Sequence, residues 1–291
     1  AGKGRPMAIE LTRPVAADGA ALADICFRAF KDISERHGYE SDFYNVEFAQ
    51  MVISGCIANE SGYSVAANVD GTLAGSNFFS FTDEVAGVGP VSVDPERQGV
   101  GAGRALMEDL LREAKEQGIE RVRLMQDSFN MTSLALYASL GFDTKHPAAL
   151  LEPVPKAHPD VRLMAVDDLD AVEALSRDIY KVSRRDDAGQ HIGRGPFKPF
   201  VRERNGRIVG YFVIGMVGHG CAETEDDLLA LAQHAASEAP PEIARCLCPL
   251  REGSLYRKML ASGFRNRKVM NLMTMGPYDE PEGAWMPSVV Y

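Results

Sequence analysis

Along this 291-residue chain the spacing of apolar residues changes between the alternation typical of a strand and the longer period of a helix. The same order of predicted strands and helices occurs twice. Residues 9–30 fit a short strand followed by a helix with one apolar face, and residues 161–180 repeat that design. Alternating segments on either side of Asp70-Gly71 predict a hairpin, and those around Asn205-Gly206 predict a second one. Each half continues with a helix, a strand, another helix and a Gly-Phe pair. The pattern therefore predicts two related domains.

Each predicted domain is of the α/β (α+β) class, with a mixed, mostly antiparallel sheet flanked by helices. The segment HPAALLEPVPKAHPD contains four prolines and predicts a linker between the halves. We expect the first domain over residues 7–148, beginning at Met7, the linker over 149–160, and the second domain with an extended tail over 161–291.

The composition restricts the classes of partner. A formal net charge of −10 argues against nucleic acid or an anionic membrane surface, and it suits a cationic substrate such as an amine. No apolar run approaches the ~20 residues that a membrane span needs. The five cysteines form neither a C-x-x-C pair nor a metal-ligand spacing with histidine, so we expect free thiols, no metal and a reducing cytoplasm. We expect a monomer or a homodimer.

Three glycines, Gly99, Gly101 and Gly103, lie between the strand-like run GVGPVSVD and a helix with an apolar face. A glycine-rich turn that leads into a helix presents several N–H donors and the positive end of the helix dipole, which together bind anions such as diphosphates. The turn lacks the Lys-Ser/Thr of a triphosphate-binding loop, and its Gly-x-Gly-x-Gly spacing is not that of a dinucleotide fingerprint. A different phosphate compound is indicated.

Two motifs resemble a known family. Residues 98–103, Gln-Gly-Val-Gly-Ala-Gly, look like the acyl-CoA pyrophosphate loop of the GCN5-related N-acetyltransferases (GNAT), Gln/Arg-x-x-Gly-x-Gly/Ala. Downstream, the segment from Asn130 to Phe142 resembles the family's Asn-x-x-Ala-x-x-Leu-Tyr-x-x-x-Gly-Phe, with Ser133 in place of alanine. The order and spacing are those of the family. The resemblance covers the whole first half, and the second half in outline.

The resemblance implies that acetyl-CoA and an amine bind together and that the amine attacks the thioester directly. It assigns pantetheine and diphosphate contacts to Val91, Ser92, Val93, Gln98, Gly99, Val100, Gly101, Ala102, Gly103, Arg104, Asn130 and Ser133. For Arg104 the alternative is a solvated side chain, and for Asn130 it is a helix cap. Tyr137 would protonate the leaving thiolate, with a core tyrosine as the alternative.

The general base and the acceptor site are less defined. Glu84 has the position that the family often gives to a basic glutamate, but its segment FTDEVAG also fits an exposed turn; Asp127 and a water chain are competitors. In this fold the segment FKDISERHGYESDFY would line the acceptor site. Its candidate substrate residues are Glu35, His37, Asp42 and Phe43, and a structural role is the alternative for each.

The second half departs from the motif. Where a glycine loop would stand it has GCAETEDD, whose acidic residues would repel a diphosphate. Aligning the two Gly-Phe pairs places Met259 opposite Tyr137, with Tyr256 offset by three residues. We therefore expect a degenerate domain. The tail carries the only tryptophan, Trp285, either on an arm over a groove or, as the preferred alternative, packed on its own domain.

The sequence thus predicts an acetyl-CoA-dependent N-acetyltransferase that acts on a primary amine of a small molecule. One alternative is a protein Nα- or lysine acetyltransferase. Another is a non-catalytic module that senses acyl-CoA.

Overall fold

The computed structural model describes residues 8–251 and 253–291, so the predicted start at Met7 lies outside the described residues. The chain packs as two compact units. Unit 1 contains the described residues up to Phe81 together with Ala86–Glu120, and unit 2 contains Thr82–Val85 together with Arg121–Tyr291. These units are defined by how the chain packs, whereas the domain boundaries predicted above follow from the repeated pattern in the sequence. Those boundaries stay a prediction.

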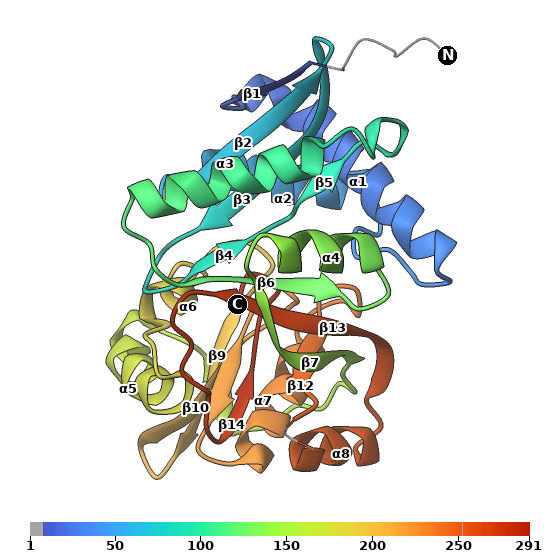
Figure 1. Ribbon diagram of the computed structural model, residues 1–291. Helices are drawn as coiled ribbons and strands as arrows, with labels where there is room; N and C mark the ends of the chain where they lie inside the picture. The colour runs from blue at the N-terminus through green and yellow to red at the C-terminus, as the bar shows by residue number, and fades with distance from the viewer. Residues whose placement is uncertain (1–7, 252) are drawn as a thin grey trace. The chain divides into compact units, whose positions relative to one another are not determined.

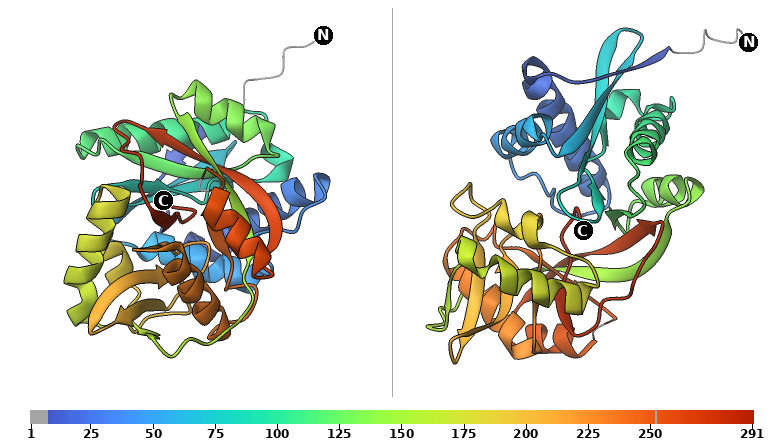
Figure 2. Two further views of the ribbon diagram at one scale, coloured as in Figure 1. Left: turned by 90° about the horizontal axis from the view of Figure 1, so that it is seen from below. Right: turned by 90° about the vertical axis from the view of Figure 1, so that its left-hand side faces the viewer.

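Unit 1 is an antiparallel sheet with helices on both faces (Figures 1 and 2). Its strands lie in the order β1 (Ile9–Thr12), β2 (Gly62–Val69), β3 (Thr72–Ser80) and β4 (Ala86–Val88), and β5 (Ser92–Val93) also pairs with β3. Figure 2 shows α1 (Gly19–Arg36) and α2 (Val46–Ala58) on one face and α3 (Ala102–Glu116) on the other. Short 3-10 turns, η1 (Ala16–Asp18) and η2 (Pro95–Arg97), precede α1 and α3. The predicted Asp70-Gly71 turn is confirmed, with φ angles of 50° and 75°.

Unit 2 contains two antiparallel sheets (Figure 1). The first has the strand order β6 (Val122–Asp127), β13 (Arg265–Met275), β7 (Asp143–Glu152) and β12 (Cys246–Pro249). The second has the order β14 (Ala284–Met286), β11 (Gly220–Ala222), β10 (Arg207–Val213), β9 (Pro199–Arg204) and β8 (Val161–Leu163). The helical elements are α4 (Met131–Ser139), η3 (Val166–Asp168), α5 (Leu169–Tyr180), α6 (Arg185–Gly189), α7 (Glu225–Ser237) and α8 (Gly253–Ala261).

The order of elements shows the predicted repeat. From β8 to β13 the second half runs through strand, 3-10 turn, two helices, hairpin, short strand, helix, strand, helix and long strand, as the first half does from β1 to β7, apart from the added β5 and η2. The repeat extends to local hydrogen bonds. The Asp18 carboxylate accepts from the Val15 N–H at 2.8 Å, and the Asp168 carboxylate accepts from the Ala165 N–H at the same distance.

Strands from the two halves alternate in the first sheet of unit 2. β13 pairs with both β6 and β7, and β7 in turn lies between β13 and β12. Strand β13 of the second half therefore separates two strands of the first half, and β7 of the first half separates two strands of the second half (Figure 1). Neither half can complete this sheet without the other.

The second sheet of unit 2 is buried on both faces. In β10, Tyr211 and Val213 belong to the hydrophobic core that contains residues of α5, whereas Phe212 belongs to the core formed with α7. The apolar run in this strand is continuous because both sets of alternating side chains are covered. Trp285 in β14 is 1% exposed and pairs with Cys221, which confirms that the tail packs on its own domain.

None of the helices in the described part of the chain is long and apolar enough to cross a membrane. All five cysteines are free thiols, as expected.

Candidate functional site

The strand before the glycine turn approaches its neighbour closely. Ser92 and Val93 of β5 pair with Ser76 and Gly75 of β3. A Cβ atom at Gly75 would lie 2.3 Å from the Ser92 carbonyl oxygen, so only glycine allows this approach. The short β5 ends at Val93, and Pro95, which lacks an N–H for the ladder, begins η2.

Asp94 fixes the turn that follows β5. Its carboxylate accepts from the Glu96 N–H at 3.0 Å and from both terminal nitrogens of Arg28 at 3.0 and 2.9 Å. The two parallel bonds to one guanidinium hold the turn against α1. The hydrogen bonds from Arg28 lower the pKa of Asp94, so the pair is ionised at neutral pH.

The glycine turn itself opens α3. Gly99 and Gly101 have φ angles of +80° and +98°, a region that other residues rarely adopt, whereas Gly103 lies in the first turn of the helix. Gly101 is the N-cap and supplies no capping side chain. The first N–H groups of a helix have no intrahelical acceptor, and they add to the positive end of the helix dipole. Gln98, Gly99 and Gly101 are exposed, so an anion can reach these donors.

The side chains of this segment have modest roles. The Gln98 side-chain amide donates to the Val93 carbonyl at 3.2 Å, which folds the turn back on β5. Arg104 is exposed and lies 3.4 Å from Glu108 one helical turn away. Val91 and Val100 are half-buried, and Ala102 is buried. The backbone, more than any side chain, therefore forms the anion site.

The second motif lies on α4 in unit 2. The Asn130 side chain accepts from the Ser133 N–H at 3.1 Å, so Asn130 caps the helix. The Ser133 hydroxyl donates to the Asn130 carbonyl at 3.0 Å and accepts from the side-chain amide of Gln126 at the same distance. Gln126 is 2% exposed and also donates to the Asn130 carbonyl at 2.7 Å. Sequence reasoning missed Gln126, because it lies in β6, outside the motif whose residues Asn130 and Ser133 it contacts.

Tyr137 is 8% exposed on α4. Burial raises the pKa of Tyr137, and the negative charge of Asp127 raises it further. The phenol is therefore neutral at pH 7 and can donate a proton. Asp127 itself is ion-paired with Lys268 at 2.6 Å, and both side chains are nearly buried. The sequence did not point to Lys268, which comes from β13 of the second half.

Glu84 lies in the Thr82–Val85 segment of unit 2 and is ion-paired. Its carboxylate accepts from Arg177 at 2.7 Å and from the Ser183 N–H at 3.3 Å. The neighbouring Asp83 accepts from the N–H groups of Asp186 and Asp187 at the start of α6. Both acidic residues thus have structural partners, and the role of Glu84 as a base stays a prediction.

The four candidate substrate residues differ in their surroundings. Glu35 is exposed near the end of α1, 3.9 Å from Lys31. The His37 ring contacts the Ile33 carbonyl at 2.8 Å. Phe43 is 7% exposed and packs edge-on against Phe30 with ring centres 4.9 Å apart, so it belongs to the core of unit 1. Asp42 precedes it and is half-buried. None of these contacts tests a substrate role.

The connection between β11 and α7, which corresponds to the glycine turn, contains no such turn. β11 leads into α7 through a two-residue connection, and Thr224 caps the helix by accepting from the Asp227 N–H at 3.2 Å. The Asp227 carboxylate is 1% exposed and ion-paired with Arg202 and Arg204. A capped N-terminus with a buried carboxylate does not suit a diphosphate. Met259, aligned with Tyr137, is a fully buried core residue.

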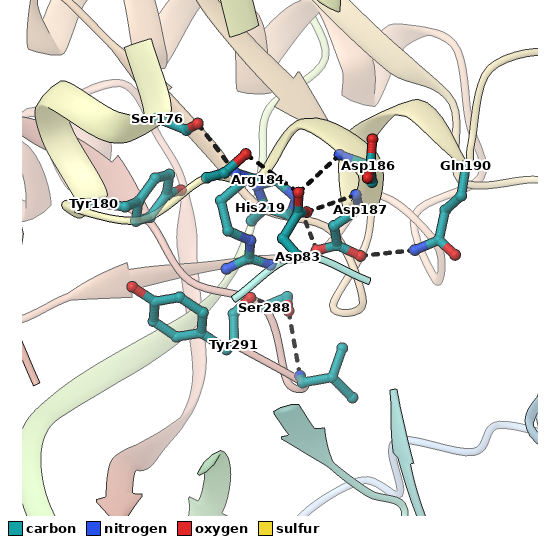
Figure 3. Close-up of polar contacts among 12 residues, drawn as sticks. Asp83, Ser176, Tyr180, Arg184, Asp186, Asp187, Gln190, His219, Ser288 and Tyr291 are labelled. Atoms are coloured by element: carbon teal, nitrogen blue, oxygen red, sulfur yellow. Dashed lines mark hydrogen bonds and ion pairs between the residues drawn. The ribbon is translucent and has the colours of Figure 1, made fainter. Parts of the chain in front are cut away.

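Unit 2 also contains a buried polar group that the sequence did not reveal (Figure 3). His219 lies between Tyr211, whose hydroxyl is 3.0 Å from Nδ1, and Asp187, whose carboxylate is 3.1 Å from Nε2. Arg184 is 4% exposed and also pairs with Asp187. These residues come from different elements, so no local spacing links them. No group of three or more His, Cys, Asp or Glu side chains within the described residues is arranged to hold a metal.

An antiparallel sheet between helices, with an uncapped glycine turn opening α3, is the arrangement that the GNAT resemblance implies for the first half. A model of the acetyltransferase (GNAT) family matches residues 21–142. The GNAT resemblance that the two motifs indicate is therefore confirmed for this segment, which is less than half of the chain.

Individual relatives match shorter segments. Mycothiol acetyltransferase from Kocuria rhizophila is 45% identical over 56 residues, covering 19% of this chain and 18% of that protein. The [ribosomal protein bS18]-alanine N-acetyltransferase of Escherichia coli is 34% identical over 76 residues, covering 26% of this chain and 51% of that protein. The matches thus span from about a fifth to half of these relatives.

The whole chain resembles a solved structure in fold. A protein of Pyrococcus horikoshii described as a candidate acetyltransferase superimposes with a TM-score of 0.78 at 13% sequence identity, covering 97% of this chain and 94% of that one. At this identity the likeness concerns the fold alone.

Proposed function

We propose that the protein is an N-acetyltransferase that transfers acetyl from acetyl-CoA to a primary amine of a small molecule. The observation that carries the proposal is the exposed glycine turn of α3, whose N-terminus has no side-chain cap and lies within the segment that matches the GNAT family. Backbone N–H groups there are suited to the diphosphate of CoA. The degenerate turn before α7 supports one cosubstrate site per chain.

The proposed chemistry needs two proton movements. The amine nitrogen bonds to the acetyl carbon, the carbon–sulfur bond breaks, and the thiolate takes a proton. We assign that proton to Tyr137, because its raised pKa keeps the phenol protonated at pH 7. The amine loses its proton to a base. Glu84 is the residue predicted for this step, with Asp127 and a water chain as competitors; the ion pairs of both carboxylates are described above.

The acceptor is assigned on charge. The net charge of −10 favours a cationic amine over an acidic surface. The names of the relatives point to mycothiol in one case and to a ribosomal protein in the other, so they do not choose between a small molecule and a protein. Release of free CoA thiol with a panel of small amines, compared with acetylation of peptides, separates the two. An acyl-CoA sensor would release none with either.

The first experiment is calorimetric titration of acetyl-CoA into the wild type, Gly101→Glu and Gly71→Glu. Both glycines are exposed, have positive φ and gain the same charge on substitution, but Gly71 lies in the β2–β3 hairpin. We expect one site in the wild type and in Gly71→Glu, and binding weakened by roughly 100-fold or more in Gly101→Glu, because a carboxylate would face the diphosphate.

Unchanged binding in Gly101→Glu would disprove the assignment of the turn. Two sites in the wild type would show that the second half also binds the cosubstrate. No binding in the wild type would reject the acetyltransferase proposal altogether.

A further inference from the structure

Unit 2 buries a set of hydrogen-bond donors for which the described part of the chain supplies no acceptor. The atoms are Nε, Nη1 and Nη2 of Arg123, Nη1 of Arg184, Nε1 of Trp285, and the hydroxyls of Thr274 and Tyr291. The side chains of Arg123 and Trp285 are 0% and 1% exposed. Buried polar groups in folded proteins almost always have partners, so a cluster of unpaired donors requires an explanation.

These donors lie close together. The Tyr291 ring packs against both guanidinium groups, with its centre 3.7 Å from Cζ of Arg123 and 4.5 Å from Cζ of Arg184. Figure 3 shows Arg184 and Tyr291 beside each other. Thr274 is the cross-strand neighbour of Arg123 in the β6–β13 ladder. The Tyr180 ring contacts both Tyr291 and Trp285, at 6.1 and 5.9 Å.

The positive charge of this cluster is only partly balanced. Arg184 is neutralised by its ion pair with Asp187. Arg123 has no carboxylate partner among residues 8–251 and 253–291, and its guanidinium lies over the aromatic rings of Tyr278 and Tyr291. Such contacts stabilise a cation by less than its burial destabilises it.

The charge on Arg123 persists despite burial. Burial lowers the pKa of Arg123, Tyr291 and Tyr278 act in the opposite direction, and the nearby Arg184 charge adds to the lowering. A guanidinium nevertheless remains protonated at neutral pH, because its intrinsic pKa lies far above neutrality. The cluster therefore holds about one uncompensated positive charge surrounded by donors and aromatic rings.

We propose that Arg123 and its neighbouring donors bind the carboxylate group of a small monovalent anion. The planar fork of Arg123 matches the two oxygens of a carboxylate, and the donors of Arg184, Thr274 and Tyr291 can complete its hydrogen bonds. A single negative charge balances the single unpaired cation, whereas a dianionic phosphate would exceed it. The proposal is independent of acetyl transfer and concerns residues outside both GNAT motifs.

The test uses the full chain and acetate as the probe. Acetate replaces chloride at constant ionic strength, and the fluorescence of Trp285, the single tryptophan, reports binding. We expect a saturable change in the wild type and none in Arg123→Met, which keeps the side-chain length without charge. Arg121→Met is the matched control, because Arg121 lies two residues away, is ion-paired with Asp279 and loses the same charge. It should respond as the wild type does.

Thermal unfolding provides a second measurement. Acetate should raise the Tm of the wild type and of Arg121→Met, whereas Arg123→Met should show no shift. Arg123→Lys, which keeps the charge but loses the fork, should bind acetate roughly tenfold more weakly. Absence of a saturable response in the wild type overturns the proposal without any variant. An equal response in Arg123→Met also overturns it.

Discussion

His219 is a buried histidine whose neighbours keep it neutral. Its side chain is 1% exposed, and burial lowers its pKa to about 4, with the charge of Arg184 as the next contribution. Asp187 acts in the opposite direction, but its charge is balanced by Arg184. In the unfolded chain the imidazole has its ordinary pKa near 6.5. Between these two values the unfolded chain binds a proton that the folded chain does not.

Stability should therefore fall on acidification. Because the unfolded state takes up the extra proton, the contribution of His219 to the unfolding free energy decreases as the pH falls through 6.5, and the decrease ends near 4. We expect a loss of roughly 2 kcal/mol between pH 7 and pH 5. Urea unfolding at both values measures it. His219→Gln should remove most of this pH dependence, and the exposed His37→Gln should retain it; equal pH dependence in all three proteins would contradict the assignment.

Tyr137 is the residue on which the proposed proton transfer depends. Tyr137→Phe removes only the hydroxyl and keeps the ring in its buried position. We expect kcat to fall by roughly 100-fold or more, since general acid catalysis contributes that much, while acetyl-CoA affinity changes little. Steady-state kinetics and calorimetry measure the two quantities. Unchanged kcat would return Tyr137 to the role of a core tyrosine.

At the scale of elements, two helices begin with the same device. Asn130 caps α4 by accepting from the Ser133 N–H, and Asn45 caps α2 by accepting from the Phe48 N–H at 2.7 Å. Only Asn130 belongs to the second GNAT motif. Comparing Asn130 with Asn45 therefore distinguishes the effect of helix capping from that of a contact with the cosubstrate.

Asn130→Ala and Asn45→Ala should each lower the unfolding free energy by about 1 kcal/mol, the usual effect of losing such a cap. If Asn130 also contacts pantetheine as predicted, only Asn130→Ala should weaken acetyl-CoA binding. Chemical unfolding and calorimetry on both variants give the comparison. Equal affinities would leave Asn130 with a capping role alone.

At the scale of the molecule, the alternation of strands in unit 2 makes the two halves interdependent. β6 and β7 are joined through β13, which lies more than a hundred residues further along the chain. Most of the hydrogen bonds that hold β6 and β7 therefore come from the second half.

A fragment that ends at residue 160 should fail to form native β6, α4 and β7. Without β13 the strands β6 and β7 expose unpaired N–H and C=O groups, and α4 loses the ordered strand β6 with which it is in contact. Hydrogen exchange on the fragment and on the full chain measures protection in residues 122–152. Adding a separately produced 161–291 fragment should restore protection. Native protection in the short fragment alone would show that the first half completes its own sheet.

Local sequence determined much of this protein. The Asp70-Gly71 and Asn205-Gly206 turns adopt positive φ as predicted, because Gly and Asn or Asp tolerate that region. The glycine turn before α3 and the Gly118 end of that helix follow from the same conformational preference. The GNAT motif could be recognised because the backbone of a contiguous segment forms the proposed anion site.

The tertiary structure decided the remainder. Glu84 pairs with Arg177 across 93 residues, and the rings of the distant Tyr278 and Tyr291 pack on Arg123. The insertion of β13 between β6 and β7 is likewise invisible in periodicity, since a strand's alternation specifies its faces and not its partners. Charge pairing and strand pairing depend on which distant segments meet, whereas turn geometry depends on residues that are adjacent in the chain.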